Sequence, residues 1–478
     1  MHHGRRKPHE STLDGTRERH DGPSDAPAPS ALALALVWSA DEPERVGEVI
    51  VVPPARRGSC FTLGRATEPG TDGALPLTLQ RLRPFGAEER GAFEAGRVSR
   101  WQLRLRTAAA DELEVEAIGR GELRVNGRSV GGASVRPGDL IEVVDRFLLL
   151  VSERPMTWPR GEPWAHPFAY AAADPFGVVG ESPAAWDLRH KLVFLGTVAG
   201  HVLVEGPSGA GKELAVRAIH ACSERAARPM IARNAATIPE GLIDAELFGN
   251  LKNYPNPGTP DRPGLLGEAD GSSLFLDEIG ELSHALQARL LRVMDSGEYQ
   301  RLGEARTRMT QVRVLAATNR DPDELKHDLL ARFPHRLRVP GLERRPEDVA
   351  LLVRHLVRGF AASSPERVER FVEHGEPRVS ARLIYALTRR AYKTQTRELG
   401  ELLWRAIGAS PGAVIDAPAE LITPAAPAPG LVDPKDLSRE HIAATLARCG
   451  GVRDRAWREL NLRNRDQLKR LLKKHHID

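Results

Sequence analysis

The stretch from residue 202 to 213, VLVEGPSGAGKE, joins an apolar run to a glycine-rich loop that ends in a lysine. Three glycines let the backbone turn its N–H groups toward a phosphate, and Lys212 adds a positive charge. A helix that begins there would point its positive end at the same place. We therefore predict a nucleotide phosphate site at Gly206, Pro207, Ser208, Gly209, Ala210, Gly211, Lys212 and Glu213. The alternative interpretation is a glycine-rich turn between a strand and a helix.

Two later apolar runs also end in polar residues. Residues 274–278 end in Asp277 and Glu278, and acids at the tip of a buried strand are costly unless they serve a metal or a water. Asp277 could hold Mg²⁺, and Glu278 could polarise an attacking water. Residues 312–319 end in Thr318 and Asn319, which could reach a γ-phosphate. Together the three strand ends predict ATP and Mg²⁺ as cofactors, unless the two acids only cap the next helix.

The composition limits the remaining choices. A chain of 478 residues should hold about three or four domains, and a net charge of +4 leaves partners to be argued from local charge. Cys60, Cys222 and Cys449 are far apart and outside any metal-ligand spacing, which favours a reducing, cytoplasmic setting. No run approaches the ~18 apolar residues that span a bilayer. Residues 31–38 alternate alanine and leucine and predict a β-strand, with a signal-peptide core as the alternative.

The hydrophobic pattern along the chain predicts a multidomain protein. Its domains are an all-β sandwich, an α/β ATPase with a helical lid, and a small all-α domain. The opening residues have almost no large apolar side chains, and we predict disorder there. The second linker, rich in alanine and proline, is predicted to form no packed core. The predicted units are a leader (1–30), a sandwich (31–153), a linker (154–175), a parallel-sheet core (176–343), a lid (344–410), a second linker (411–432) and a basic helical domain (433–478).

Six separated motifs between about 176 and 410 resemble one family, the AAA+ ATPases of bacterial enhancer-binding proteins, which activate sigma-54 RNA polymerase. Besides the loop and strand ends, residues 176–182 (FGVVGES) resemble the mouth of that family's nucleotide pocket. Residues 231–236 and 245–249 resemble the segment before its polymerase-contacting loop. By this resemblance, Asn234 would pair with Glu278 and report the state of the γ-phosphate.

The same resemblance assigns residues that act between subunits. Residues 325–332 look like the segment that carries arginine fingers, with Arg332 at one finger position and Lys326 at the other. A lysine there lacks the planar fork of an arginine. Residues 396–399 resemble the second sensor, which makes Arg397 the lid's contact with ATP. The family assembles as rings, so a homo-oligomer, a hexamer by resemblance, is implied. An ordinary surface ion pair is the alternative for Arg332 or Arg397 alone.

One departure concerns the loop that engages the sigma factor. The family carries Gly-Ala-Phe-Thr-Gly-Ala after residues equivalent to 246–249, but here residues 253–258 read NYPNPG. Neither Phe nor Thr is in place, and two prolines stiffen the loop. Tyr254 could replace the aromatic contact, but remodelling of sigma-54 polymerase is an open question on this sequence.

The predicted sandwich resembles a forkhead-associated domain, a reader of phosphothreonine peptides. The resemblance rests on Gly64-Arg65, on residues 98–102 and on Asn126-Gly127, in the expected order. It implies that Arg65, Ser99 and Arg100 bind a phosphate and that Asn126 fixes the peptide backbone. Gln102 stands where the family has a histidine. The alternative is a sandwich used only for contacts within the assembly.

The last 45 or so residues resemble a Fis-type helix-turn-helix. Apolar residues at helical spacing predict a three-helix core from Ile442, Leu446, Ala456, Leu460, Leu462, Leu468, Leu471 and Leu472. Asn461 would occupy the turn position, usually glycine, because asparagine tolerates left-handed backbone. The opposite face predicts contacts with double-stranded DNA through Arg463, Asn464, Arg465, Gln467, Lys469 and Lys473. A solvated charged face is the alternative.

Three functional hypotheses follow. The first is a cytoplasmic, ATP-hydrolysing, DNA-binding regulator of sigma-54 polymerase, controlled by a phosphothreonine partner. The second keeps the ATPase and DNA binding but gives up sigma-54, because the loop at 253–258 is altered. The third is a non-catalytic phosphopeptide adaptor with a vestigial ATPase, which the presence of Lys212, Asp277, Glu278 and Asn319 disfavours.

Overall fold

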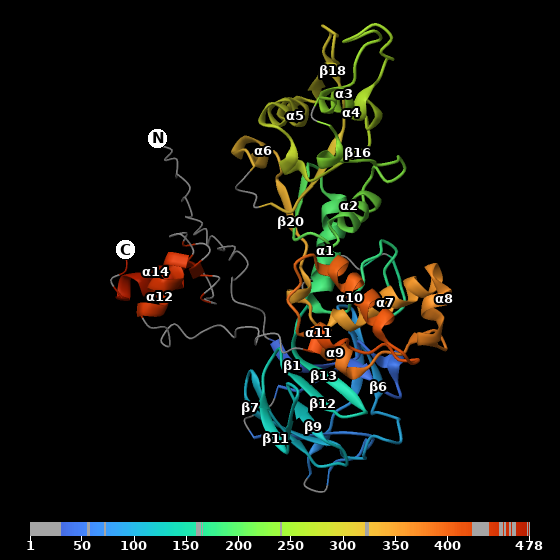
Figure 1. Ribbon diagram of the computed structural model, residues 1–478, viewed down its shortest axis with the longest axis vertical. Coiled ribbons are helices and arrows are strands. Elements are labelled where there is room, and N and C mark those ends of the chain that lie inside the picture. The colour runs from blue at the N-terminus through green and yellow to red at the C-terminus, as the bar shows by residue number, and fades with distance from the viewer. Residues whose placement is uncertain are drawn as a thin grey trace, which may run out of the picture.

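The computed structural model describes residues 30–54, 58–70, 73–158, 164, 166–239, 241–320, 325–422, 439–448, 453, 456–457, 460, 465–475 and 477. In Figure 1 a β-sandwich, an orange helical lid and a green-to-yellow α/β core follow one another along the long axis. The predicted leader lies almost wholly outside the described residues.

The sandwich consists of two facing sheets, ordered β10-β9-β12-β13-β1-β2-β5-β6 and β11-β8-β7-β3-β4. The strand predicted at 31–38 is β1, and apolar residues of both sheets fill the space between them. The strands are β1 (Ser30–Ser39), β2 (Val49–Val51), β3 (Cys60–Leu63), β4 (Leu75–Pro76), β5 (Leu79–Arg83), β6 (Gly86–Gly91), β7 (Leu103–Ala109), β8 (Glu112–Ala117), β9 (Leu123–Val125), β10 (Arg128–Val130), β11 (Gly132–Val135), β12 (Leu140–Val143) and β13 (Phe147–Pro155).

The α/β core is built on a five-stranded sheet ordered β15-β16-β19-β14-β20, in which every pairing is parallel. This confirms the predicted parallel sheet. The carboxyl ends of β14, β16 and β19 are therefore brought to one edge. The elements are α1 (Pro183–Thr197), β14 (Val202–Glu205), α2 (Lys212–Ala221), β15 (Ile231–Asn234), α3 (Ile243–Phe248), α4 (Gly264–Glu268), β16 (Ser273–Asp277), α5 (His284–Ser296), β17 (Glu298–Tyr299), β18 (Arg308–Met309), β19 (Arg313–Thr318), α6 (His327–Ala331) and β20 (His335–Arg338).

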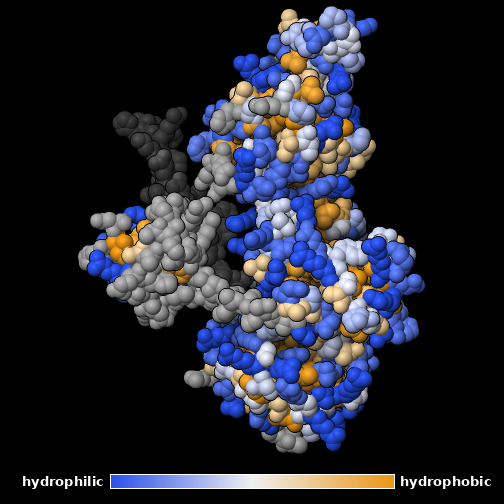
Figure 2. Space-filling model, in the orientation of Figure 1, coloured by the Kyte–Doolittle hydropathy of each residue, from blue (hydrophilic) through white to orange (hydrophobic). Residues whose placement is uncertain are grey.

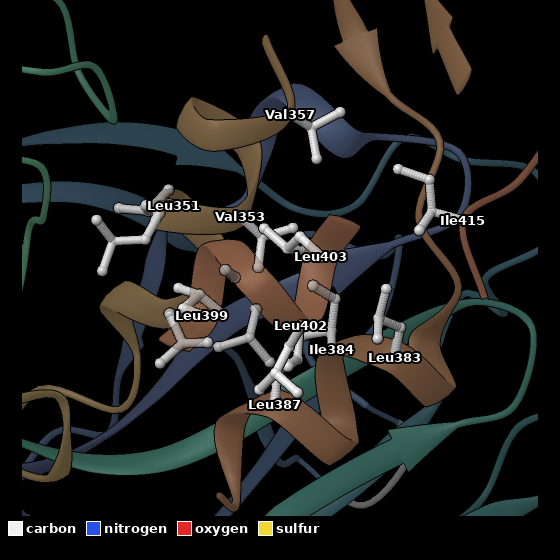
Figure 3. Close-up of a cluster of buried hydrophobic side chains, with 14 of the residues drawn as sticks. Leu351, Val353, Val357, Leu383, Ile384, Leu387, Leu399, Leu402, Leu403 and Ile415 are labelled. Carbon is white, nitrogen blue, oxygen red and sulfur yellow. The ribbon is translucent and has the colours of Figure 1, made fainter. Parts of the chain in front are cut away.

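Helices α7, α9 and α10 of the lid meet in an apolar cluster (Figure 3). Ile415 is fully buried in this cluster, and its N–H bonds the carbonyl of Arg378 at 2.8 Å. The predicted start of the second linker at 411 is therefore wrong, because an isolated apolar residue in an Ala/Pro-rich stretch has packed onto the lid. The elements are α7 (Asp348–Ser363), α8 (Pro365–Val368), β21 (Val372–Glu373), β22 (Glu376–Pro377), α9 (Ala381–Thr388), α10 (Gln395–Ala409) and α11 (Ala419–Ile422).

The sandwich and the lid share one core. Val37 of β1 and Leu148 and Leu150 of β13 lie on the outer face of their sheet and are buried together with lid side chains such as Leu351. The predicted linker 154–175 is not a free tether. Its Phe168 stacks on Trp186 of α1 at 5.8 Å between ring centroids, and Tyr170 donates to the carbonyl of Gly47 at 2.6 Å.

The carboxyl-terminal helices form a separate small cluster. Helices α12 (Arg439–Arg448) and α14 (Arg465–His475) pack through residues of the predicted core. Of that core, Leu462 lies outside the described residues, as does the predicted turn residue Asn461. The buried members are Ile442, Leu446, Ala456, Leu460, Leu468, Leu471 and Leu472.

Hydrophilic residues dominate the face of the molecule shown in Figure 2. Among the described residues, no helix is long and apolar enough to cross a membrane.

Candidate nucleotide-binding site

The glycine loop joins β14 to α2 and closes against the lid. Gly211 caps α2 with a φ of 100°, and a side chain on Gly209 would place its Cβ 2.2 Å from the carbonyl oxygen of Thr394. Only glycine fits this close approach. Lys212 donates to the carbonyls of Gly206 and Pro207 at 3.0 and 3.4 Å, so its amino group lies over the loop. The residues present fit a nucleotide phosphate.

Burial lowers the pKa of Lys212, while the carboxylates of Glu278 and Asp277 oppose that shift. These acids therefore lie near the lysine, as predicted from the three strand ends. Lys212 is only 7% exposed, and its charge attracts an anionic ligand more strongly here than it would in water, because the surroundings screen it less.

The acids at the end of β16 have distinct partners. Asn234 at the end of β15 donates from Nδ2 to Asp277 Oδ2 at 3.3 Å, and not to Glu278 as the resemblance implied. The register explains this, because Asn234 lies directly opposite Asp277 in the parallel pairing. Glu278 instead accepts from the backbone N–H of Asn319 at 3.2 Å. Its φ of 52° is left-handed, and such strained backbone clusters at functional sites.

The lid brings Arg397 to the loop. The N–H of Thr396 donates to the carbonyl of Gly209 at 3.3 Å, and Arg397 lies close enough for its charge to lower the pKa of Lys212. Arg397 is exposed, so its guanidinium is accessible to a ligand. Thr394 and Thr396 are contacts that sequence reasoning missed, and only their position beside Arg397 could have indicated them.

The predicted finger residues lie apart from this cluster. Arg332 follows α6 and forms an ion pair with Asp295 at the end of α5, which raises the pKa of Arg332. Its side chain is 43% exposed. Lys326 precedes α6 as its N-cap.

Sequence reasoning also missed Asp348, at the start of α7. Its carboxylate accepts from the N–H groups of Glu181 and Ser182 at 2.9 and 3.0 Å, and from the Ser182 hydroxyl at 2.6 Å. Burial raises the pKa of Asp348 to about 6. Pro346 followed by two acids is a helix-start pattern that could have drawn attention to it.

The sandwich brings together three of the four residues assigned to phosphopeptide binding. The N–H of Arg65 bonds the carbonyl of Ser99 at 3.1 Å, Ser99 Oγ accepts from the N–H of Arg120 at 3.0 Å, and Arg100 pairs with Glu68. Gln102, fully buried, accepts from the N–H of Ser99 and donates to the carbonyl of Arg120. It therefore braces this loop from the position where the resembling family has histidine.

Asn126 is not with this group. It follows strand β9, on the far side of that strand from Arg120. The Asn126 carboxamide ties the end of β9 to the start of β12, because Oδ1 accepts from the N–H of Leu140 at 3.1 Å and Nδ2 donates to Asp139 at 2.7 Å. Asn126 Oδ1 also accepts from Arg389 of the lid at 2.6 Å.

In the carboxyl-terminal cluster, Lys469 and Lys473 of α14 are exposed, as the helical spacing predicted. Arg465 and Gln467 also belong to α14, but the structure does not describe their side chains. Arg463 and Asn464 lie outside the described residues.

Comparison with known proteins places this arrangement in a family. Residues 178–340 match the model of the sigma-54 interaction domain. The transcriptional regulatory protein ZraR of Salmonella typhimurium is 36% identical over 315 residues, which cover 63% of this chain and 69% of that protein. The anaerobic nitric oxide reductase transcription regulator NorR of Escherichia coli is 44% identical over 184 residues, 37% of this chain and 36% of that protein.

A crystal structure of NtrX from Brucella abortus in complex with ATP aligns with a TM-score of 0.45 and 26% identity, covering 62% of this chain and 69% of that one. The sequence similarity to ZraR extends over more than two thirds of that regulator. The chain belongs to the family of transcriptional regulators that carry a sigma-54 interaction domain.

Proposed function

We propose that the chain is an ATP-hydrolysing, DNA-binding regulator of transcription. The observation that carries this proposal is the arrangement in which Lys212 follows β14 and Asp277 and Glu278 end β16 at one edge of the parallel sheet, while Arg397 of the lid lies beside Gly209 of the loop. Lys212 would bind the β- and γ-phosphates, Asp277 would hold Mg²⁺, and Glu278 would orient the attacking water. Asn319 fixes Glu278 through its backbone N–H, and Asn234 does the same for Asp277 through its carboxamide.

We propose that the active form is a ring, a hexamer by the family resemblance. Arg332 is half exposed, and its partner, Asp295, is an exposed acid, so exchanging that partner for a phosphate costs little. In a ring it would reach the γ-phosphate of the neighbouring subunit, with Lys326 as a second cation.

Hydrolysis should require Mg²⁺, and its specific rate should rise with protein concentration, because each site is completed by a neighbour. Phosphate release measured across a dilution series tests this. Lys212→Ala, which lacks the charge on the phosphates, provides the baseline. A wild-type rate no higher than this baseline would contradict the proposal of ATP hydrolysis. A specific rate that does not depend on protein concentration would contradict a site shared between subunits.

Two candidates remain for the polymerase. The family supports contact with sigma-54 polymerase, and the loop at 250–262 would supply it. The loop is closed at its base, because Asn250 and Arg262 exchange backbone hydrogen bonds of 3.1 and 3.0 Å, and it presents Tyr254 with 44% of its surface exposed. In the second possibility, the protein acts on another form of RNA polymerase or serves as a repressor. The replacement of Phe and Thr in residues 253–258 favours it.

We also propose that the sandwich reads phosphothreonine. Arg65 uses Nε on the carbonyl of Val98 at 2.7 Å, which leaves its terminal nitrogens for a ligand. Arg100 is exposed and pairs with the exposed carboxylate of Glu68, and a phosphate dianion is a stronger partner than a surface carboxylate.

The full chain should bind a phosphothreonine peptide library and should not bind the unphosphorylated form. Arg65→Ala should weaken binding by about 1.5–3 kcal/mol, because it removes a hydrogen bond to a charged group. Fluorescence anisotropy measures this, with Arg106→Ala as a charge-matched control on the exposed pair with Glu114. Equal binding of both peptide forms, or of neither, would leave the sandwich with a structural role.

We propose that residues 433–478 bind double-stranded DNA. The exposed Lys469 and Lys473 would contact phosphates, and Arg465 or Gln467 would lie near base edges, with Arg463 and Asn464 at the start of the same helix. A ring would present several copies of this domain, so paired half-sites are expected.

A further inference from the structure

Residues 174–182 form a wall beside the glycine loop. A side chain on Gly177 would contact Leu214 of α2 at 3.4 Å, and Val178 is buried with Ala210 of the loop and Ala215 of α2. Gly180 has a φ of 140°, and a Cβ there would lie 2.4 Å from an oxygen of Asp348. A displacement of this segment therefore changes the walls of the nucleotide site.

Glu181 of this segment is held by the sandwich. Arg83 of β5 forms a bidentate pair with this carboxylate. Its Nε donates to Oε2 at 3.1 Å, and its Nη2 donates to Oε1 at 2.6 Å. The carboxylate is 3% exposed and also accepts from the N–H of Ala171 and from Trp186 Nε1. The Arg83 guanidinium also lies over the ring of Phe168, 4.3 Å from its centroid.

A second sandwich arginine reaches the start of α7. Arg154 of β13 forms a bidentate pair with Glu347, at 3.2 and 2.6 Å, and both side chains are at most 10% exposed. Glu347 directly precedes Asp348, whose carboxylate holds the backbone of Glu181 and Ser182. Both arginines therefore hold residues 180–182. Arg83 does so directly through Glu181, and Arg154 does so through Glu347 and Asp348 of the lid.

The carboxylates of both pairs are at most 10% exposed, so removing the arginine leaves a buried carboxylate without its counter-charge. Such a carboxylate must move toward water or take up a proton. Either response would shift residues 180–182 and the first turn of α7. The apolar contact between sandwich and lid keeps the arginines in place, because Val37, Leu148 and Leu150 are covered only when the sandwich is docked.

We propose that Arg83 and Arg154 are positioning residues of the nucleotide site, so that the docked sandwich sets the affinity of the ATPase for nucleotide. This inference rests on the proposed binding of ATP. On this proposal the docked sandwich strengthens nucleotide binding, whereas an inhibitory domain would weaken it. The coupling should have the size usual between linked sites, about 5- to 150-fold.

The test uses full-length protein and a fluorescent ADP analogue, together with steady-state hydrolysis. Arg83→Ala and Arg154→Ala should each raise the nucleotide Kd and the KM for ATP by at least about fivefold, with kcat at saturating ATP little changed. Arg106→Ala, which breaks an exposed pair within the sandwich, should behave as wild type.

Two further variants separate positioning from folding. The exchange Arg154→Glu with Glu347→Arg should recover most of the affinity that Arg154→Glu alone loses. Arg83→Lys keeps the charge without the fork and should give an intermediate Kd. If the alanine variants do not fold, these variants carry the test.

The outcomes are distinct. Wild-type affinity in the Arg83 and Arg154 variants would overturn the positioning role and leave ATP binding intact. A loss in Arg154→Glu that the exchange does not recover would also overturn it. If wild type and Lys212→Ala bind the analogue equally, the nucleotide site itself fails, and the positioning role fails with it.

Discussion

Replacing Arg332 with alanine should lower ATP hydrolysis by about a thousandfold or more, toward the rate of Lys212→Ala. In the proposed ring this guanidinium neutralises charge that develops on the γ-phosphate of the neighbouring subunit. Its only partner among the described contacts is Asp295 of its own chain, so the loss leaves no buried charge behind. Binding of an ADP analogue should change little, because ADP lacks the γ-phosphate that the finger would contact.

Mixing two inactive proteins tests whether the finger acts between subunits. Arg332→Ala retains its own phosphate loop, and Lys212→Ala retains its finger, so mixed rings contain some complete sites. Phosphate release should reappear in the mixture and should be greatest near equal proportions. Wild-type turnover by Arg332→Ala would contradict the finger assignment, and a mixture as inactive as its parts would contradict a site shared between subunits.

Replacing Glu278 with glutamine should abolish turnover and preserve nucleotide binding. A positioned general base contributes typically about 10²- to 10⁴-fold to a rate, and a carboxamide cannot take the proton from water. Glutamine keeps an oxygen that can accept from the N–H of Asn319, so the strained backbone at 278 should remain in place.

The measurement pairs phosphate release with binding of a fluorescent ADP analogue for the same protein. Lys212→Ala is the matched control, because it should lose binding as well as turnover. Appreciable turnover by Glu278→Gln would mean that another residue activates the attacking water. A loss of binding equal to that of Lys212→Ala would mean that Glu278 serves the structure of the site.

The nucleotide site was largely predictable because its residues lie at the ends of apolar runs. A parallel sheet gathers the ends of β14, β16 and β19 at one edge, so the spacing along the chain decides which side chains meet. The partner of Asn234 was predicted incorrectly, since choosing between Asp277 and Glu278 depends on the strand register. The core of the carboxyl-terminal domain followed from helical periodicity, which reports directly which face is apolar.

The docking of the sandwich on the lid was not predicted, although a signal was present. Residues 147–151 are apolar without alternation, which indicates a strand that is buried on both faces. The pattern does not tell what covers the second face, and here it is the lid, some 200 residues later in the chain. For the same reason Asn126 could be read as a ligand group, while in the fold its side chain joins the end of β9 to β12 and accepts from Arg389 of the lid.

We propose that ATP turnover by this chain regulates transcription, with the sigma-54 form of RNA polymerase as the first candidate target. The most direct measurement is transcription from a promoter that carries this protein's binding site, reconstituted with purified polymerase, with and without sigma-54. We expect transcripts only with wild-type protein, ATP and sigma-54 together, and none with Glu278→Gln. Transcripts that are equally abundant with Glu278→Gln would contradict a role for ATP turnover, and transcripts that are equally abundant without sigma-54 would contradict the sigma-54 candidate in favour of the second one.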